Sequence, residues 1–361
     1  MSLSCGIVGL PNAGKSTLFK ALTSIPVLIK DYPFSTIKPN VGLVPVDDER
    51  LYSLALISKP EKITPSFMKV VDVAGLVKGA HKGEGLGNQF LANLREVSVL
   101  IHVIADYEEN DYSSESGGNI VDKAETVNQE LILSDLDAVE KRIEKNKKKL
   151  KIGEKDYAEE NNFLDKIHKH LDNGNLIRNM ELRDEELAVL DELNLLTIKD
   201  IIYVLNRNET NFKETIPRVF KDYADGQQAP VTTICAKLED ELQDLESEER
   251  ELFKQEYSLE KSALQNIVDN CLIMLELVTF FTVKGDETKA WLLKDKATAL
   301  EAAGKIHTDM QEGFISVDVI AHDALTEVGS LQVAREKGVL RSEGKRYNVK
   351  DGDVLYFRFN K

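Results

Sequence analysis

The sequence predicts an α/β protein built on a parallel sheet, with a helical insertion and a small C-terminal α+β domain. Three observations predict this architecture. Short apolar, β-branched runs recur between segments of helical character, which is typical of buried parallel strands. Between residues 132 and 150 the apolar spacing changes to steps of four and three, which is typical of a coiled coil. After residue 280, strand-like runs surround one short helix.

Five apolar runs indicate the sheet domain. The expected strands cover residues 4–9, 68–73, 97–105, 201–205 and 231–234. A helix is expected over 16–22, directly after the first strand and a glycine-containing loop. We therefore expect the sheet domain to consist of residues 1–125 and 199–276.

The expected insertion is an α-helical coiled-coil hairpin over residues 126–198. The seam of its first helix consists of Ile132, Leu136, Val139, Ile143, Asn146 and Leu150. One polar residue therefore interrupts an apolar line. A turn is expected near Gly153, a second helix through Leu164 to Leu171, and a third helix over 184–193.

Residues 277–361 are expected to form the small α+β domain. Strands are expected over 280–283, 314–320 and 354–359, and the single helix over 297–306. The order of expected elements in this C-terminal region differs from that in the sheet domain, because short strands here follow one another with little helix between them.

The segment from Gly9 to Thr17 carries the clearest chemical signal. It fits the pattern G-x-x-x-x-G-K-[ST] and lies between an expected strand and an expected helix. Its glycines let backbone N–H groups point at phosphate oxygens, and the following helix directs its positive end at the same anion. We expect Lys15 to reach the β- and γ-phosphates and the Ser16 hydroxyl to bind Mg²⁺. The loop residues expected to bind nucleotide are Gly9, Asn12, Ala13, Gly14, Lys15, Ser16 and Thr17.

Two further segments complete the expected Mg²⁺ and phosphate site. Asp72 to Gly75 is a D-x-x-G pattern at the end of an expected strand. We expect Asp72 to hold the Mg²⁺ shell, partly through water, and the Gly75 N–H to sense the γ-phosphate. The loop 31–40 is expected to fold over the nucleotide and to offer the Thr36 hydroxyl to Mg²⁺. The alternative is an ordinary loop bounded by prolines.

The nucleotide base is expected beside Asn206-Arg207-Asn208-Glu209, after the strand 201–205. GTP-binding proteins place N-K-x-D here, and the Asp carboxylate accepts two hydrogen bonds from the guanine edge. Glu209 is one methylene longer and Arg207 replaces the Lys, so the sequence predicts poor guanine specificity without explaining an adenine preference. The residues expected at the base are Asn206, Arg207, Glu209 and Ala236. For the loop at Ala236, an ordinary strand-to-helix connection is the alternative.

Composition and charge exclude several classes. The net charge is −16, which argues against a generally basic nucleic-acid-binding protein. No apolar run approaches the roughly 20 residues of a membrane span, so no membrane partner is expected. Cys5, Cys235 and Cys271 are widely separated and lack metal-ligand spacing, which favours a reducing, cytoplasmic compartment.

With these motifs in place, the sequence resembles the YchF family, the Obg-like ATPases, over nearly its whole length. The strings that carry the resemblance are GLPNAGKSTLF, DYPFSTIKPNVG, DVAGLVKGAHKGEGLGNQFLANLRE, NRNE, TKAWLL, KIHTDMQEGFI and DGDVLYFRFN. The resemblance implies a P-loop NTPase domain (G domain) with a helical hairpin and a C-terminal TGS domain, a ubiquitin-like module. It also implies that ATP is preferred over GTP, and that the protein binds the ribosome or the large ribosomal subunit.

The catalytic step is the least defined part of the resemblance. Ras-like enzymes orient the attacking water with a Gln after the D-x-x-G glycine, whereas Leu76 stands there in this chain. We therefore expect slow turnover, with Lys15 and Gly75 as the groups at the reacting phosphate. Asn12 resembles an asparagine that binds K⁺ in potassium-activated relatives. K⁺ as an activator is one expectation for Asn12, and stabilisation of the loop turn is the other.

One feature departs from the family pattern. Relatives carry a His in the loop after the fourth strand, but residues 107–120 contain none here. His81, in the glycine-rich stretch, is the candidate substitute. His102 lies in an apolar strand and is expected to be structural.

Residues 141–151 carry seven Lys or Arg and one Glu. On an acidic chain, this basic helix end is expected to dock on rRNA phosphates, with salt-sensitive affinity. The alternative is a solvated face of the coiled coil.

Functions from different classes remain open at this level. One is a slow Mg²⁺-dependent ATPase whose nucleotide state gates ribosome binding. Another is a nucleotide-sensing binding module in which hydrolysis is incidental. A GTP-specific ribosome-assembly GTPase is the third, and Glu209 opposes it.

Overall fold

The computed structural model describes residues 4–24, 41–72, 91, 93–107, 119–150, 157–256 and 263–360. These residues form two compact units. Residues 43–68 and 268–360 belong to the second unit, and the other described residues belong to the first. The chain passes from one unit to the other within two strands and one helix, which are β2, β4 and α10. The expected boundaries of three domains stay a prediction.

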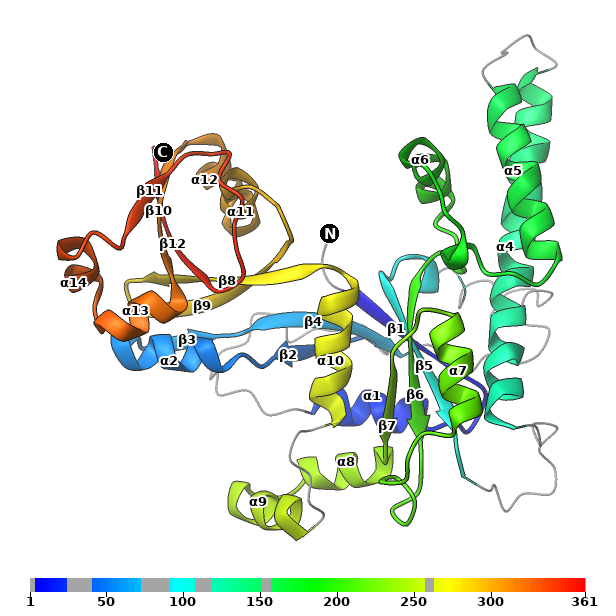
Figure 1. The fold of residues 1–361 in the computed structure, drawn as a ribbon, viewed down its shortest axis with the longest axis horizontal. Helices are drawn as coiled ribbons and strands as arrows, with labels where there is room; N and C mark the ends of the chain where they lie inside the picture. The colour runs from blue at the N-terminus through cyan, green and yellow to red at the C-terminus, as the bar shows by residue number, and fades with distance from the viewer. Residues whose placement is uncertain are drawn as a thin grey trace. The chain divides into compact units, whose positions relative to one another are not determined.

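A six-stranded sheet in the order β2-β4-β1-β5-β6-β7 lies mainly in the first unit, while residues 43–46 of β2 and 66–68 of β4 belong to the second (Figure 1). Its strands are β1 (Ser4–Val8), β2 (Val41–Val46), β4 (Ser66–Asp72), β5 (Val99–Ala105), β6 (Asp200–Asn206) and β7 (Val231–Ile234). β1 pairs in parallel with β4 and β5, β5 with β6, and β6 with β7. The predicted parallel α/β sheet is thereby confirmed, and its carboxyl ends share one edge.

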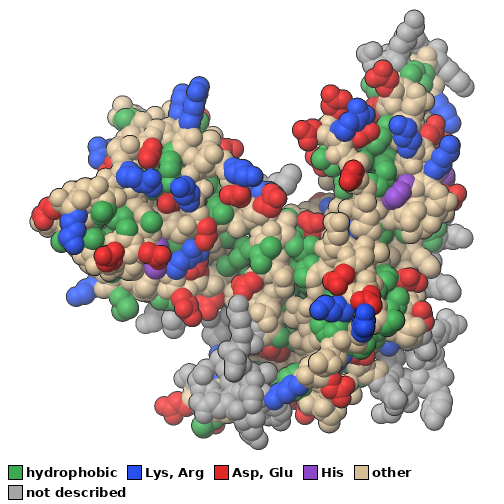
Figure 2. Space-filling view, in the orientation of Figure 1, with side chains coloured by type: hydrophobic (Ala, Val, Ile, Leu, Met, Phe, Trp, Pro, Cys, Tyr) green, Lys and Arg blue, Asp and Glu red, His purple; other side chains and the backbone are tan. Residues whose placement is uncertain are grey.

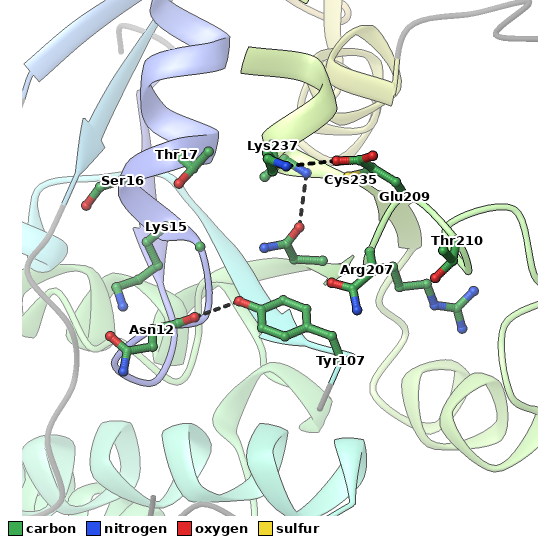
Figure 3. Close-up of a pocket in the computed structure, with 14 residues that line it drawn as sticks. Asn12, Lys15, Ser16, Thr17, Tyr107, Arg207, Glu209, Thr210, Cys235 and Lys237 are labelled. Carbon is green, nitrogen blue, oxygen red and sulfur yellow. Dashed lines mark hydrogen bonds and ion pairs between the residues drawn. The ribbon is translucent and has the colours of Figure 1, made fainter. Parts of the chain in front are cut away.

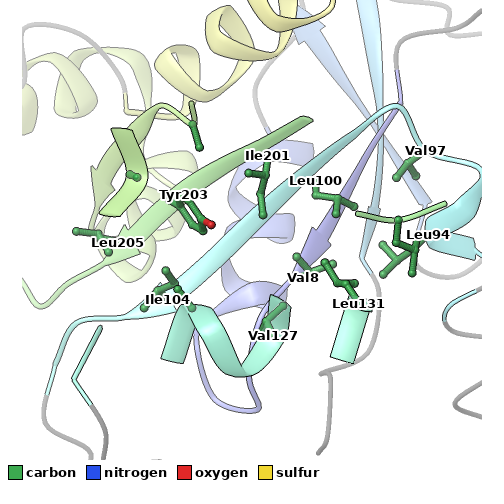
Figure 4. Packing of buried hydrophobic residues seen from close by; sticks show 14 of the residues in the cluster. Val8, Leu94, Val97, Leu100, Ile104, Val127, Leu131, Ile201, Tyr203 and Leu205 are labelled. Atoms are coloured by element: carbon green, nitrogen blue, oxygen red, sulfur yellow. The ribbon is translucent and has the colours of Figure 1, made fainter. Parts of the chain in front are cut away.

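Helices cover this sheet on both faces (Figure 1). The helices of the sheet region are α1 (Lys15–Thr23), α7 (Arg218–Gly226), α8 (Ala236–Gln243), α9 (Ser247–Glu256) and α10 (Ala263–Met274). α1 packs on α8. On the other face α7 and the first half of α4 (Ile120–Leu150) close a continuous apolar core against β5 and β6 (Figure 4).

The helical insert begins inside α4. Ala124, Val127 and Leu131 of this helix are buried in the core of the sheet, whereas Val139 and Ile143 pack on the other insert helices. One straight helix therefore joins the two cores. The remaining insert elements are α5 (Tyr157–Asp172), the 3₁₀ helix η2 (Ile177–Asn179) and α6 (Asp184–Leu193).

A buried carboxylate ties the insert to the sheet. Asp135 of α4 is fully buried, and its oxygens accept hydrogen bonds from the backbone N–H groups of Leu196 and Thr197 and from the Thr197 hydroxyl. Arg95 also donates to it at 3.2 Å. Farther along α4, the seam residue Asn146 is buried and donates to Glu160 of α5, so the predicted polar position has a partner. The expected turn at Gly153 lies outside the described residues.

The second unit is a six-stranded mixed sheet in the order β11-β10-β12-β8-β9-β3. Its strands are β3 (Lys62–Thr64), β8 (Leu277–Lys284), β9 (Glu287–Lys294), β10 (Phe314–Ala321), β11 (Arg341–Glu343) and β12 (Asp353–Phe359). Its helices are α2 (Glu49–Ser58), α11 (Ala299–Ile306), α12 (Thr308–Glu312), α13 (His322–Val328) and α14 (Leu331–Glu336). α11 packs on one core of the sheet, and α2, α13 and α14 pack on the other.

Two expectations for this C-terminal region need correction. The expectation of one short helix after residue 280 was wrong, because the described residues 281–360 contain four helices. In addition, β3 pairs in parallel with β9, so an early segment of the chain completes the second sheet. No local pattern signals a pairing between Lys62 and Glu287, which are more than 220 residues apart. The assignment of this unit as a TGS domain stays a prediction.

Candidate nucleotide-binding site

A polar pocket of about 790 Å³ lies at the carboxyl edge of the first sheet (Figure 3). Its lining comes from the phosphate loop and the start of α1, from Tyr107 two positions after β5, from the end of β6 and its following loop, and from the start of α8. The lining residues are Asn12, Gly14, Lys15, Ser16, Thr17, Tyr107, Asn206, Arg207, Asn208, Glu209, Thr210, Cys235, Ala236 and Lys237. In open parallel sheets, ligands bind outside the carboxyl ends of the strands. The two motifs read from the sequence therefore meet around one cavity.

The phosphate loop adopts backbone conformations that its sequence permits. Gly9 has φ 152° and Gly14 has φ 94°, values that favour glycine. A Cβ atom at Gly14 would lie 2.1 Å from Asn206 Nδ2. Asn12 has φ 62°, a left-handed conformation that Asn tolerates better than most residues. This conformation is a local reason for an asparagine at position 12 and agrees with a role in stabilising the turn, whereas K⁺ binding stays a prediction.

Lys15 is held at the start of α1. Its side chain folds back over the loop, and Nζ donates to the Leu10 carbonyl at 2.7 Å. Burial lowers the pKa of Lys15, and the nearby Asp72 carboxylate partly offsets that effect. A buried ammonium held by one carbonyl binds an anion strongly, because the charge of the anion offsets the free-energy cost of removing the ammonium from water.

Ser16 and Asp72 meet in a way that fits a magnesium ion. Ser16 Oγ donates to Asp72 Oδ2 at 3.1 Å. Asp72 Oδ1 is buried and has no hydrogen-bond partner among the described residues. Burial raises the pKa of Asp72, while Ser16 and Lys15 act in the opposite direction. Mg²⁺ prefers hydroxyl, carboxylate and water oxygens, so this pair is chemically suited to it.

Asn206 joins two of the pocket loops. Its Nδ2 donates to the Ala13 carbonyl at 3.0 Å, and its Oδ1 accepts from the Ala236 backbone N–H at 3.0 Å. The side chain is only 6% exposed. Both ends of the amide are therefore committed to backbone, and Asn206 fixes the phosphate loop against the loop that follows β7.

Arg207 lies beside the pocket but directs its guanidinium elsewhere. Nε donates to Asp106 at 2.6 Å, and a terminal nitrogen donates to the Glu214 carbonyl at 2.6 Å. Its side chain is 2% exposed. Arg207 lines the pocket, while its guanidinium stabilises the loop after β6.

Glu209 stands at the end of the pocket away from the phosphate loop. One of its carboxylate oxygens accepts a hydrogen bond from Lys237 Nζ at 3.0 Å (Figure 3). Lys237 also lies 3.8 Å from Glu241 on the next turn of α8. The sequence suggested a second pocket loop at Ala236 and Lys237, but it did not indicate this ion pair.

Tyr107 is a pocket residue that the sequence did not single out. Its hydroxyl donates to the Asn12 carbonyl at 2.7 Å, across 95 positions of sequence (Figure 3). Only a prediction of β5 ending beside the phosphate loop would have suggested it. The contact supports the turn at Asn12.

The chain is similar to known proteins over its full length. The protein called "Ribosome-binding ATPase YchF" of Haemophilus ducreyi is 44% identical over 363 residues, and the match covers all of both chains. The chain belongs to the YchF family. A protein of the same name from Bacillus subtilis is 41% identical over the full length of both chains. Two family models match, one described as 50S ribosome-binding GTPase over residues 4–152 and YchF-GTPase_C, described as a protein of unknown function, over 277–360.

A solved structure of the YchF family supports the fold. The Schizosaccharomyces pombe YchF GTPase is 29% identical, with a TM-score of 0.87, and the match covers 99% of this chain and 98% of that chain. The P-loop domain, with a further C-terminal domain, is thereby established for this chain. The Haemophilus ducreyi and Bacillus subtilis relatives are named ATPases, whereas the Schizosaccharomyces pombe relative is named a GTPase.

Several predicted YchF-family residues lie outside the described parts of the chain. These are Thr36, Gly75, Leu76 and His81, and the expected roles of all four stay predictions. Most of the loop 107–120 is also outside. His102, expected to be structural, is 1% exposed, and burial lowers its pKa to about 3. A buried neutral imidazole agrees with that expectation.

The basic end of the insert is partly neutralised. Lys141 pairs with Asp137, and Arg142 pairs with Glu160 and Glu192. Figure 2 shows acidic and basic side chains mixed over the insert helices. Among the described Lys and Arg residues of 141–151, those that are exposed and have no ion pair to a described residue are Lys145, Lys147 and Lys148. The sequence-based count of basic residues therefore overstates the cationic surface. Among the described residues, no helix is long and apolar enough to span a bilayer.

Proposed function

We propose that this chain is a slow, Mg²⁺-dependent NTPase that prefers ATP over GTP and whose nucleotide state gates binding to the ribosome or its large subunit. The observation that carries the proposal is the pocket itself. Lys15 and the Ser16–Asp72 pair lie at one end, and Glu209 lies at the other. A triphosphate and a purine fit those two ends in the order that a nucleotide requires.

The residues of the chain supply positioning and charge for hydrolysis. Backbone N–H groups from Gly9 to Thr17 hold the phosphates, and Lys15 exchanges the Leu10 carbonyl for phosphate oxygens. Ser16, Asp72 and Thr36 would hold Mg²⁺, which neutralises charge on the phosphates. Water attacks the γ-phosphate in line with the leaving oxygen. Beside Lys15, the Gly75 N–H would donate a hydrogen bond to the γ-phosphate. Since Leu76 cannot orient that water, intrinsic turnover is slow.

The preference for ATP rests on the base end of the pocket. Guanine-specific sites use both oxygens of one carboxylate, whereas one oxygen of Glu209 is engaged by Lys237. The names of the Haemophilus ducreyi and Bacillus subtilis relatives agree with ATP. K⁺ at Asn12 is a further proposal, supported only by the position of that residue in the loop.

Ribosome binding is proposed from the names of the relatives and from the insert. Both named relatives are ribosome-binding, and the matching N-terminal model is described as 50S ribosome-binding. Lys145, Lys147 and Lys148 are exposed and available for rRNA phosphates. A cytoplasmic location follows from this partner.

Two assays on the purified chain test the proposal together. Phosphate release is measured with ATP or GTP, with and without Mg²⁺, K⁺ and 50S subunits, and co-sedimentation with 50S subunits is measured under the same nucleotides. Stimulation of ATP turnover by subunits or K⁺, with nucleotide-dependent co-sedimentation, supports the enzyme. Nucleotide-dependent co-sedimentation with unchanged turnover would favour the nucleotide-sensing module instead.

A further inference from the structure

The base end of the pocket holds two charged side chains that are still able to meet a ligand. Asn206 uses both ends of its amide on backbone, and Arg207 binds Asp106 and Glu214. The charged groups that remain there are Glu209 and Lys237, whose side chains are 41% and 72% exposed. Among the described residues of the pocket, Glu209 and Lys237 are therefore the charged side chains that could recognise a nucleotide base.

The pair presents a donor beside an acceptor. Lys237 Nζ donates to Glu209 Oε1 at 3.0 Å and lies 3.8 Å from Glu241, a separation too long for a hydrogen bond, so two of its hydrogens can still be donated to a ligand. The second oxygen of Glu209 remains an acceptor. Figure 3 shows the two side chains reaching toward each other, Glu209 from the loop after β6 and Lys237 from the first turn of α8. The pair therefore offers a ligand a mixed edge, one donor (Lys237) beside one acceptor (Glu209), whereas a free carboxylate offers two acceptors.

This mixed edge changes which purine is favoured. A free carboxylate accepts from both N1–H and the 2-amino group of guanine, and adenine has no such pair of donors. The ion pair accepts from one guanine N–H and donates to its O6, which leaves the 2-amino group without a partner on the pair. Adenine presents its donor and acceptor in the opposite order, so it pairs in a shifted position, in which its N1 accepts from Lys237, its 6-amino group donates to Glu209, and neither group lacks a partner.

We propose that Lys237 is the specificity-determining residue of this pocket, because its pairing with Glu209 removes the advantage of guanine and completes an edge for adenine. This inference rests on the proposed nucleotide-binding function. It attributes the loss of guanine specificity to the ion pair. If the longer side chain of Glu209 were the whole cause, replacing Lys237 would not change the ratio of GTP affinity to ATP affinity.

The test is competition of ATP and GTP against fluorescent ADP with Mg²⁺, in the full chain and in Lys237→Ala. Removing the ammonium frees both Glu209 oxygens, so the ratio of GTP affinity to ATP affinity is expected to rise about tenfold, the worth of one hydrogen bond to a charged group. Lys221→Ala, an exposed substitution on α7, is the matched control and leaves the ratio unchanged.

A second variant keeps the result specific. In Lys237→Ala/Glu209→Gln the amide has a single acceptor oxygen, so the gain for GTP is expected to disappear. An unchanged ratio in Lys237→Ala overturns the inference while leaving the proposed function intact. Failure of the unmodified chain to bind either nucleotide overturns both. Because Lys237 is 72% exposed, its replacement leaves the core untouched.

Discussion

Replacing Asn206 with alanine removes the link between the phosphate loop and the loop after β7. In the folded chain, this side chain donates to the Ala13 carbonyl and accepts from the Ala236 N–H. Alanine makes neither bond. We expect the phosphate loop and the start of α8 to open locally and nucleotide affinity to fall with them.

The magnitude follows from the burial of the two bonds. Asn206 is 6% exposed, so its partners have little access to water once the amide is gone. A buried backbone group left without a partner costs about 1–3 kcal/mol. Two such groups favour local opening by at least about 2 kcal/mol, which is roughly 30-fold in the opening equilibrium.

Hydrogen exchange and nucleotide titration measure the two consequences. Amide exchange across residues 9–17 and 231–240 is expected to accelerate roughly 30-fold in Asn206→Ala, with a comparable loss of ATP affinity. Asn173→Ala, at the exposed end of α5, is the matched control. Unchanged exchange at Ala236 in Asn206→Ala would refute the idea that this amide holds the two loops together.

Three further outcomes are expected. His102 has a pKa of about 3 when folded, below its usual value of 6.5, so the unfolded chain binds the extra proton and stability falls as the pH drops from about 6.5 toward 3. Urea unfolding should show the unmodified chain losing about 1.4 kcal/mol per pH unit more than His102→Leu in that window; parallel profiles would contradict this. Asp72→Asn should raise the Mg²⁺ concentration for half-maximal turnover about 10–100-fold, and an unaltered Mg²⁺ dependence would remove Asp72 from the metal site. Gly14→Ala should weaken ATP binding more than tenfold by fluorescence titration, because its Cβ would lie 2.1 Å from Asn206 Nδ2, and retained affinity would mean the loop adapts.

The local parts of the site could be predicted from the sequence because their determinants are adjacent in the chain. A buried strand, a glycine loop and a helix follow one another in the first 23 residues, and β1 and α1 lie where this order predicts. Similarly, α6 runs from Asp184 to Leu193, as its apolar spacing indicates. Periodicity and turn chemistry are local properties, so they can be recognised in the sequence without knowledge of the fold.

The cross-chain contacts could not be predicted in the same way. Tyr107 reaches Asn12, Lys237 reaches Glu209, and Asn206 reaches Ala13 only because parallel strands end at one edge. The sequence marks the two motifs as binding loops but carries no signal for which side chains turn inward. Arg207 illustrates this, since its guanidinium binds Asp106 although its motif suggests a base contact.

The measurement that most directly tests the central claim is titration of the purified chain with ATP and GTP in Mg²⁺, beside Lys15→Ala. The pocket geometry predicts that ATP binds more tightly than GTP, and that Lys15→Ala loses most of the affinity for both because the phosphates lose their ammonium. Equal binding by Lys15→Ala would contradict the placement of the phosphates. Tighter binding of GTP would contradict the preference for ATP and favour a GTPase.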